Sequence, residues 1–166
     1  FRSLPVEWVT IEEPDPEGDT VRKEGFQKGA ARFSRGEGIC YSDGEFFFTC
    51  TNGGRHGRGQ IWRYVPGKDS TEGGSIELFV EPNDRNKLDA PDNIVMGPMG
   101  DLFVCEDGAN TQYIVGINSR GELYKFARNA LNGSEFCGAC FSPDGGTMFV
   151  NIQTPGLTFA IWGPWS

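Results

Sequence analysis

Apolar and aromatic side chains occur along this chain in short runs, most of them bounded by glycine, proline or aspartate. Three of these runs continue through a glycine-containing turn into a second apolar run, at Ile39–Phe48, Ile94–Val104 and Ala139–Val150. Short runs rich in β-branched and aromatic residues that flank such turns are typical of β-hairpins. The pattern therefore predicts three equivalent hairpins.

Further apolar segments follow the hairpins at similar spacing. They are Gln60–Tyr64 and Ser75–Phe79 after the first hairpin, Tyr113–Ile117 and Glu122–Phe126 after the second, and Leu157–Trp162 after the third. Four short strands that repeat over about 45 to 55 residues indicate a propeller blade. The last blade is one strand short, and propellers commonly complete such a blade with a strand from the other end of the chain. A β-sandwich is the rival fold, but it does not explain the repeated hairpin.

We therefore predict an all-β fold, a β-propeller that is present here as a partial ring of about three blades. The predicted blades are 35–89, 90–134 and 135–166, with Ile39–Ser42, Ile94–Gly97 and Ala139–Ser142 as their innermost strands. Because a closed propeller typically has four to eight blades, we expect this chain to be the C-terminal part of a larger single-domain propeller.

Residues 1–34 do not follow the repeat, and we expect them to form a lead-in to the first blade. Leu4–Ile11 is a candidate strand, and the acidic, proline-broken run Glu12–Asp19 predicts an exposed loop. A short helix is expected near Val21–Ala31, although its two glycines weaken it.

The composition supports many turns and excludes several partners. Twenty-four glycines and ten prolines among 166 residues are too many for a helical bundle. The net charge of −8 argues against a nucleic-acid backbone as partner. No apolar run reaches the length of a membrane span, and we expect no membrane partner. The five cysteines are an odd number and form no paired disulfide framework.

Candidate chemistry begins just before the first hairpin, in Arg35-Gly36-Glu37-Gly38. Residues two apart in an extended segment point to the same side, so Arg35 and Glu37 address one site. A carboxylate can hold a cation, and an arginine can grip an oxyanion at two positions. The alternative is an ordinary surface ion pair in a turn.

Superimposing the repeats places Glu37 opposite Asp92, each two residues before the isoleucine of its inner strand. The leading ends of inner strands share one rim of a propeller, so these carboxylates converge. Like charges held close are costly unless a cation neutralises them. The alternative for Asp92 is that it starts a turn, as Asp often does. Glu135 lies near the equivalent rim of the third blade, two residues earlier than strict register.

Glu106 and His56 are two further candidate residues, each singled out by its neighbours in the sequence. Glu106 directly follows the apolar run Leu102–Cys105, where a carboxylate needs a partner, although a solvated turn is the alternative. His56 is the only histidine, and its glycine-rich surroundings favour a loop position over a general-acid role.

Several motifs occur in a fixed order and together resemble the C-terminal part of the PhoX-type alkaline phosphatases. The similarity runs from about Ala31 to Trp165 and is less clear over the first thirty residues. Its motifs are Arg32–Gly38, Gly59–Tyr64, Ala90–Asn93, Cys105–Gly108, Phe126–Asn129, Gly138–Gly145, Phe149–Gly156 and Ala160–Trp165.

The resemblance implies a phosphatase that hydrolyses phosphate monoesters at a cluster of calcium and iron ions. By this resemblance Arg35 and Glu37 are catalytic, with Arg35 binding the substrate phosphate and Glu37 a metal ligand. Asp92 and Glu106 match acidic positions in or beside the cluster, and Asn93 and Asp107 are further metal candidates. The remaining ligands, a cysteine among them, belong to blades absent from this sequence, so none of the five cysteines is assigned that role.

The resemblance also implies a Tat-exported parent in the periplasm or outside the cell, monomeric when intact. Two alternatives stay open. One is a calcium-dependent propeller hydrolase of the gluconolactonase and regucalcin kind, which resembles this chain at Glu37 and Asp92 and holds a single calcium. The other is a non-catalytic propeller that binds partners and uses calcium for stability only.

Overall fold

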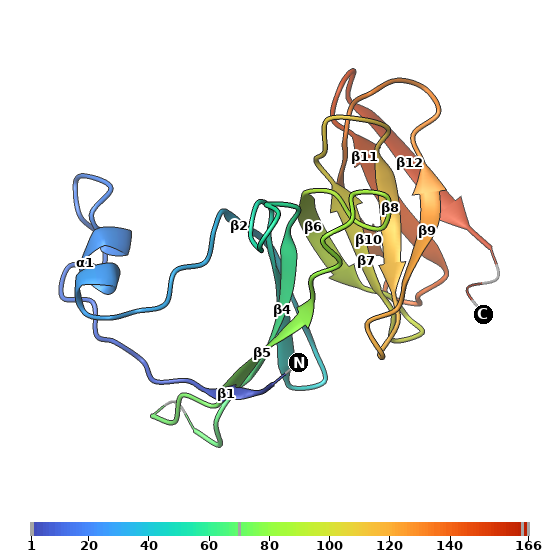
Figure 1. Cartoon of the computed structure of the whole chain (residues 1–166). Helices are drawn as coiled ribbons and strands as arrows, with labels where there is room; N and C mark the ends of the chain where they lie inside the picture. Colours follow the sequence, from blue (N-terminus) through green and yellow to red (C-terminus); the bar gives the residue numbers. More distant parts are fainter. Residues whose placement is uncertain (1, 70, 164, 166) are drawn as a thin grey trace.

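The computed structural model describes residues 2–69, 71–163 and 165, and its regular structure is almost entirely β-strand (Figure 1). The strands form three antiparallel sheets that follow one another along the chain. The first sheet has the order β1-β5-β4-β3-β2, with β1 (Leu4–Pro5), β2 (Gly36–Ser42), β3 (Glu45–Cys50), β4 (Gln60–Val65) and β5 (Ser75–Val80). The second comprises β6 (Pro91–Met96), β7 (Leu102–Glu106), β8 (Tyr113–Ile117) and β9 (Leu123–Arg128). The third comprises β10 (Phe136–Phe141), β11 (Thr147–Ile152) and β12 (Leu157–Trp162).

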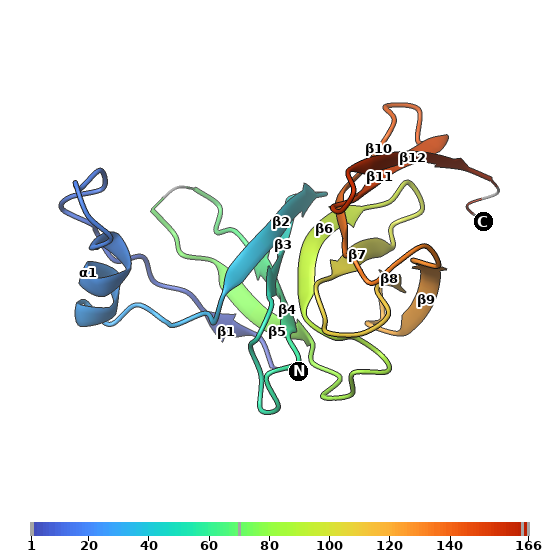
Figure 2. The same ribbon diagram turned by 90° about the horizontal axis from the view of Figure 1, so that it is seen from above.

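The innermost strands are β2, β6 and β10, one from each sheet. Strand β2 lies against β6, and β6 lies against β10, so the three sheets meet along these strands. Seen from above, the first two sheets stand side by side and the third lies beyond the second (Figure 2). The predicted partial propeller is confirmed, because the three hairpins belong to three separate sheets.

Each innermost strand starts upstream of its predicted beginning, at Gly36, Pro91 and Phe136. The reason is that all three carry a break in register near their first residues. The breaks lie between Gly36 and Ile39, between Pro91 and Ile94, and between Cys137 and Cys140. A bulge of this kind interrupts the alternation of side chains, so the hydrophobic pattern becomes visible only after it.

Strand β7 is the centre of the hydrophobic core, because every one of its residues is buried. Leu102 and Val104 face the first sheet, where they pack in a cluster with Phe47 and Ile61. Phe103 and Cys105 belong to a second cluster, which extends into the third sheet. The second sheet is thus covered on both faces by its neighbours. The five cysteines are free, as the absence of a paired framework predicts.

The third sheet has three strands, and its last strand is the predicted Leu157–Trp162. Most of β12 is exposed, including Phe159 and Trp162. This strand has no partner on its outer side among the described residues, so the third blade is one strand short, as the sequence predicts.

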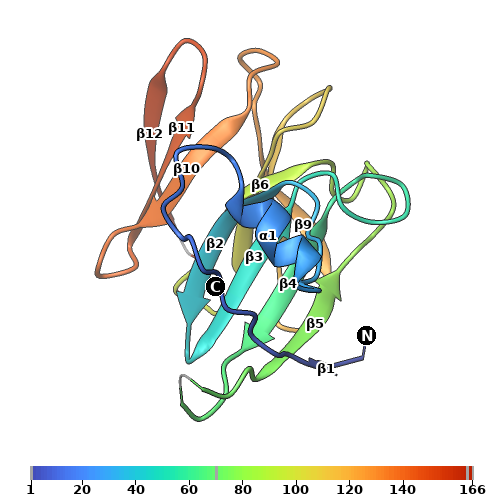
Figure 3. The same cartoon turned by 90° about the vertical axis from the view of Figure 1, so that its left-hand side faces the viewer.

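The lead-in is less regular than predicted. Only Leu4–Pro5 of the expected strand forms a strand, β1, which pairs with β5, and one further backbone hydrogen bond, from Val6 N–H to the Gly74 carbonyl, follows it. The expected helix is α1 (Val21–Gln27), which ends before Gly29 takes a positive φ of 88°. Helix α1 lies on the side of the first sheet that faces away from the second (Figures 1 and 3). Within the described residues, no helix is long and apolar enough to cross a membrane.

Strands β2 and β6 approach each other tightly at Gly38. A Cβ atom at this position would lie 2.5 Å from the carbonyl oxygen of Asp92 and 2.8 Å from the amide nitrogen of Ile94. Real Cβ atoms do not come this close to backbone, so only glycine allows the two strands their observed separation. Gly36, two residues earlier on the same strand, has open space around the equivalent position.

We predict that Gly38→Ala destabilises the protein by about 1–3 kcal/mol, the usual cost of overpacking, because β2 must move away from β6. The control Gly36→Ala should change the free energy of unfolding by less than about 0.5 kcal/mol. Urea unfolding of both variants beside the wild type measures the difference. Equal stability of the two variants would show that the approach of the strands is not tight.

Candidate functional site

Three carboxylates meet at the leading ends of the innermost strands. Asp92 lies on β6, Asp107 directly follows β7, and Glu135 directly precedes β10. Each offers a carboxylate oxygen, and these oxygens all lie within 4.8 Å of one another. All three residues are half-buried. With Glu37 at the start of β2, we call these four residues the acidic rim.

Arg35 joins the first sheet to this group. Its Nε donates to Glu37 Oε1 at 3.2 Å, and its Nη2 donates to Asp107 Oδ2 at 2.9 Å. The hydrogen bond that Arg35 donates to the Asp107 carboxylate is the main cause that raises the pKa of Arg35. Arg35 also has a positive φ of 51°, which is uncommon for a residue with a side chain and concentrates at functional sites. Its side chain is 47% exposed, so part of the guanidinium remains open to solvent.

The electrostatics of the acidic rim favour a cation. Burial and the neighbouring carboxylates of Asp107 and Asp92 raise the pKa of Glu135 to about 7. Burial, then the charges of Glu37 and Asp107, raise the pKa of Asp92. Glu135 Oε2 is buried and has no hydrogen-bond partner within the part of the chain that the structure describes. A buried carboxylate oxygen without a donor, beside two further carboxylates, is the environment that a hard cation with oxygen ligands fits.

The structure brings together four of the residues singled out from the sequence: Arg35, Glu37, Asp92 and Asp107. Glu135, which the sequence placed near the equivalent rim but two residues earlier than strict register, lies with them. Strands β2, β6 and β10 each carry one extra residue at corresponding positions, so the counterpart of Glu37 and Asp92 on β10 is Gly138. Glu135 instead reaches the rim from the residue that directly precedes β10.

Glu106 lies apart from the acidic rim. Its side chain is buried, and its Oε1 accepts hydrogen bonds from the Asp89 backbone N–H at 2.9 Å and from Lys125 Nζ at 2.9 Å. Successive side chains of an extended segment point to opposite sides, so Asp107 turns toward the rim and Glu106 turns away. The partner that a buried carboxylate needs is thus a lysine of β9.

Asn93 and His56 also have defined places. Asn93 Oδ1 accepts a hydrogen bond from the backbone N–H of Ala139 at 2.7 Å, which connects β6 to β10 at the bulge of the third sheet. A role for Asn93 as a metal ligand stays a prediction. His56 is exposed in the loop between β3 and β4, the position expected from its glycine-rich surroundings.

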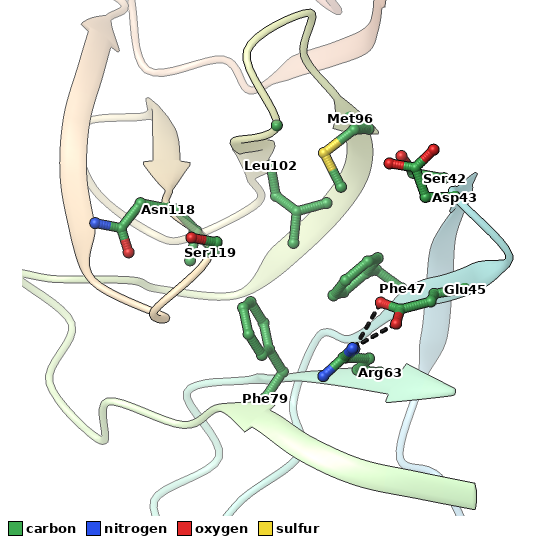
Figure 4. A pocket seen from close by; sticks show the side chains of 12 residues that line it. Ser42, Asp43, Glu45, Phe47, Arg63, Phe79, Met96, Leu102, Asn118 and Ser119 are labelled. Carbon is green, nitrogen blue, oxygen red and sulfur yellow. Dashed lines mark hydrogen bonds and ion pairs between the residues drawn. The ribbon is translucent and has the colours of Figure 1, made fainter. Parts of the chain in front are cut away.

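A separate cavity of about 260 Å³ lies at the opposite end of the first two sheets (Figure 4). Strand β2 begins at the acidic rim and ends at Ser42, which lines this cavity. Arg63, which lines this cavity, donates to Glu45 and to Glu77, with Nη1 at 2.8 Å from Glu77 Oε1. Two carboxylates therefore neutralise that guanidinium, and the described residues that line the cavity offer no other cationic group to an oxyanion.

Comparison with known proteins identifies one family. The family model for alkaline phosphatase PhoX matches residues 3–156. Among solved structures, Pseudomonas fluorescens PhoX in complex with vanadate, a transition state analogue, superimposes with a TM-score of 0.66 at 23% identity. The match covers 81% of this chain and 32% of that chain, so this chain spans about a third of the length of that relative. No curated protein matches the sequence.

Lyases share the architecture as well. Catalytically inactive H270A virginiamycin B lyase from Staphylococcus aureus with quinupristin superimposes with a TM-score of 0.53 at 22% identity, over 80% of this chain and 43% of that one. A streptogramin B lyase structure gives 0.50 at 21% identity, over 79% and 41%. At these identities the likeness shows the fold alone.

The raised pKa of Glu135 predicts how the stability of the metal-free protein depends on pH. In the unfolded chain this carboxyl titrates near its ordinary value of 4.5, and in the folded protein near 7. Between these values the folded state holds more protons than the unfolded state, so stability falls as pH rises. We expect Glu135→Gln to reduce this slope. Urea unfolding across the pH range measures it, and an unchanged slope in the variant would contradict the assignment.

Proposed function

Because the chain belongs to the PhoX family of alkaline phosphatases, we propose that the intact protein hydrolyses phosphate monoesters at calcium and iron ions held by the acidic rim. The observation that carries the proposal is the convergence of Asp92, Asp107 and Glu135 from separate strands next to a half-exposed arginine. A cation site beside an oxyanion-binding group is what phosphoryl transfer requires.

The donor set fits the calcium part of this proposal. The acidic rim offers carboxylate oxygens, which are the ligands that Ca²⁺ prefers. Glu135 Oε2 is buried and accepts no hydrogen bond from the described residues, and a bound cation would give it a partner. Iron rests on the family resemblance. Further ligands come from parts of the protein outside this chain.

Arg35 is the group that we assign to the phosphate. Its guanidinium now bridges Glu37 and Asp107. If cations shared the charge of these carboxylates, the N–H groups of Arg35 would be available to donate to a phosphate oxygen. The solved PhoX relative is a complex with vanadate, a transition state analogue and an oxyanion. Bound cations would polarise the phosphoryl oxygens and stabilise the charge that develops on them.

The cellular setting follows from the family resemblance alone. We propose that the parent is exported to the periplasm or beyond the cell and acts as a monomer. Cell fractionation with size measurement of the native protein tests both statements. Retention in the cytoplasm, or a stable oligomer, would contradict them.

Elemental analysis of the intact protein, together with an assay on a generic aryl phosphate, tests the function itself. Several ions per chain, iron among them, and aryl phosphate turnover that is lost on chelation support the phosphatase. A single divalent ion without phosphatase activity would support the lactonase alternative. Bound calcium with no hydrolytic activity would support a non-catalytic propeller.

We predict that residues 1–166 alone show negligible phosphatase activity, because they carry only part of the metal ligands. The measurement compares aryl phosphate turnover by the purified chain and by the intact protein, with circular dichroism to confirm that the chain has its β-structure. Comparable turnover by the two would refute the division of the site between parts of the protein.

We further predict different effects for two substitutions in the intact protein. Glu37→Gln should lower both metal content and activity, because an amide is a weaker ligand than a carboxylate. Arg35→Lys should leave metal content unchanged but weaken transition-state stabilisation by about 1–3 kcal/mol, because an ammonium cannot reproduce the bidentate geometry of a guanidinium.

Arg120→Lys and Glu122→Gln are matched controls, since these two residues form an exposed ion pair with each other in the segment between β8 and β9. Metal content and kcat/KM are measured for all four variants. If Arg35 and Glu37 formed only a surface pair, their substitution would change neither quantity, and the active-site assignment would fail.

A further inference from the structure

We propose that the buried hydroxyl of Thr49 is a positioning group for the acidic rim. By tying β2 to β6 it fixes the spacing of Glu37 and Asp92, and it thereby sets the affinity of the rim for a divalent cation. The inference rests on the proposed function, and it assigns a role to a residue with no charge and no metal-ligand chemistry of its own.

Thr49 connects two strands that belong to different sheets. It lies on β3 with no exposed surface. Its Oγ1 accepts a hydrogen bond from the backbone N–H of Gly38 at 2.9 Å and donates one to the backbone carbonyl of Asp92 at 2.7 Å. Gly38 directly follows Glu37, and Asp92 is itself a member of the rim. One hydroxyl therefore links the backbones that carry two of the four carboxylates.

The bulges explain why this hydroxyl is needed. In the pairing of β2 with β3, Gly36 stands opposite Cys50 and Ile39 opposite Phe48, so two residues, Glu37 and Gly38, face Thr49 alone. A bulge of this kind leaves a backbone group outside the ladder, and a buried backbone group without a partner is costly. Thr49 satisfies the N–H of Gly38 from the residue directly opposite.

The bulge in β6 leaves a backbone acceptor for the same hydroxyl group. Pro91 pairs with Glu106 and Ile94 with Val104, so Asp92 and Asn93 are the residues outside the regular ladder. The carbonyl of Asp92 is then free to accept the Thr49 hydroxyl across the sheet boundary. Because Gly38 already leaves no room for a Cβ atom beside Asp92, the two backbones have little freedom to settle elsewhere.

The third sheet meets the same need with a different side chain. There the backbone N–H of Ala139, within the bulge of β10, donates to Asn93 Oδ1. Both boundaries between sheets are thus bridged at their bulges by a side-chain oxygen from a neighbouring strand. Because the same kind of bridge occurs at both boundaries, we infer that these hydrogen bonds are a regular structural feature of the rim.

Thr51 provides a matched control on the same segment. It is as deeply buried as Thr49, with 1% exposure against 0%. Its Oγ1 has no hydrogen-bond partner within the described part of the chain. Thr→Val preserves the shape of the side chain at both positions, so the two variants differ in whether a bridging hydroxyl is lost.

The experiment uses the intact protein, stripped of metal and titrated with Ca²⁺ by calorimetry, with circular dichroism to confirm folding. For Thr49→Val we expect Ca²⁺ affinity to fall about 10- to 100-fold, the usual effect of removing a group that orients metal ligands. Thr49→Ser keeps the hydroxyl and should bind like the wild type. Thr51→Val should also bind like the wild type, because no bridge is lost.

Three results would overturn the inference: wild-type affinity in Thr49→Val, weakened affinity in Thr49→Ser, or equal losses in Thr49→Val and Thr51→Val, which would indicate a packing effect. The serine variant decides the matter if the valine variant does not fold. If the wild type binds no Ca²⁺, the proposed function fails, and a crystal structure of Thr49→Val then tests the positioning separately. Glu37 and Asp92 must have moved apart in it, and an unchanged separation would refute the role of Thr49.

Discussion

The acidic rim depends on one constraint: the innermost strands must lie very close together at positions where their own ladders are interrupted. The bulges in β2, β6 and β10 fall near the first residues of each strand, and they release backbone groups that need partners. Gly38 permits the approach, and the oxygens of Thr49 and Asn93 satisfy the released groups. Regular pairing at these positions would leave no such groups to bridge the sheets.

This arrangement brings several negative charges close together, and their proximity does not stabilise the folded state. The carboxylates of Asp92, Asp107 and Glu135 lie so close together that each makes it harder to ionise the others, as the elevated pKa of Glu135 shows. Arg35 offsets part of this cost by bridging Glu37 and Asp107. Groups held against their own electrostatic preference concentrate at functional sites. A bound cation would relieve the remaining repulsion, so the same feature that weakens the metal-free protein favours metal binding.

The sequence predicted the strands and, through the repeat and the family resemblance, Glu37, Asp92 and Asp107 of the rim, with Glu135 out of register. The hairpins and the convergence of Glu37 with Asp92 follow from alternation and from the repeat, which hold wherever the ladder is regular. Glu135 lies outside the register of the repeat, because the position on β10 that corresponds to Glu37 and Asp92 is occupied by Gly138. Glu106 points away from the rim because its neighbour Asp107 takes the face toward it, and a role for Glu106 beside the metal cluster stays a prediction. Thr49 carries no charge, so only its two hydrogen bonds identify it.

The carboxylates of the rim come from all three sheets, so the geometry of the candidate site depends on how the sheets pack against one another. Each sheet supplies one or two carboxylates, and no single sheet supplies a complete ligand set for a hard cation, which takes six to eight oxygens in the case of Ca²⁺. The geometry of the site is therefore fixed by contacts between sheets and only secondarily by contacts within them. Mutations at sheet boundaries, far from any charged group, should then affect the site more than equally buried mutations inside one sheet. In such an architecture the packing between sheets determines the geometry of the candidate site.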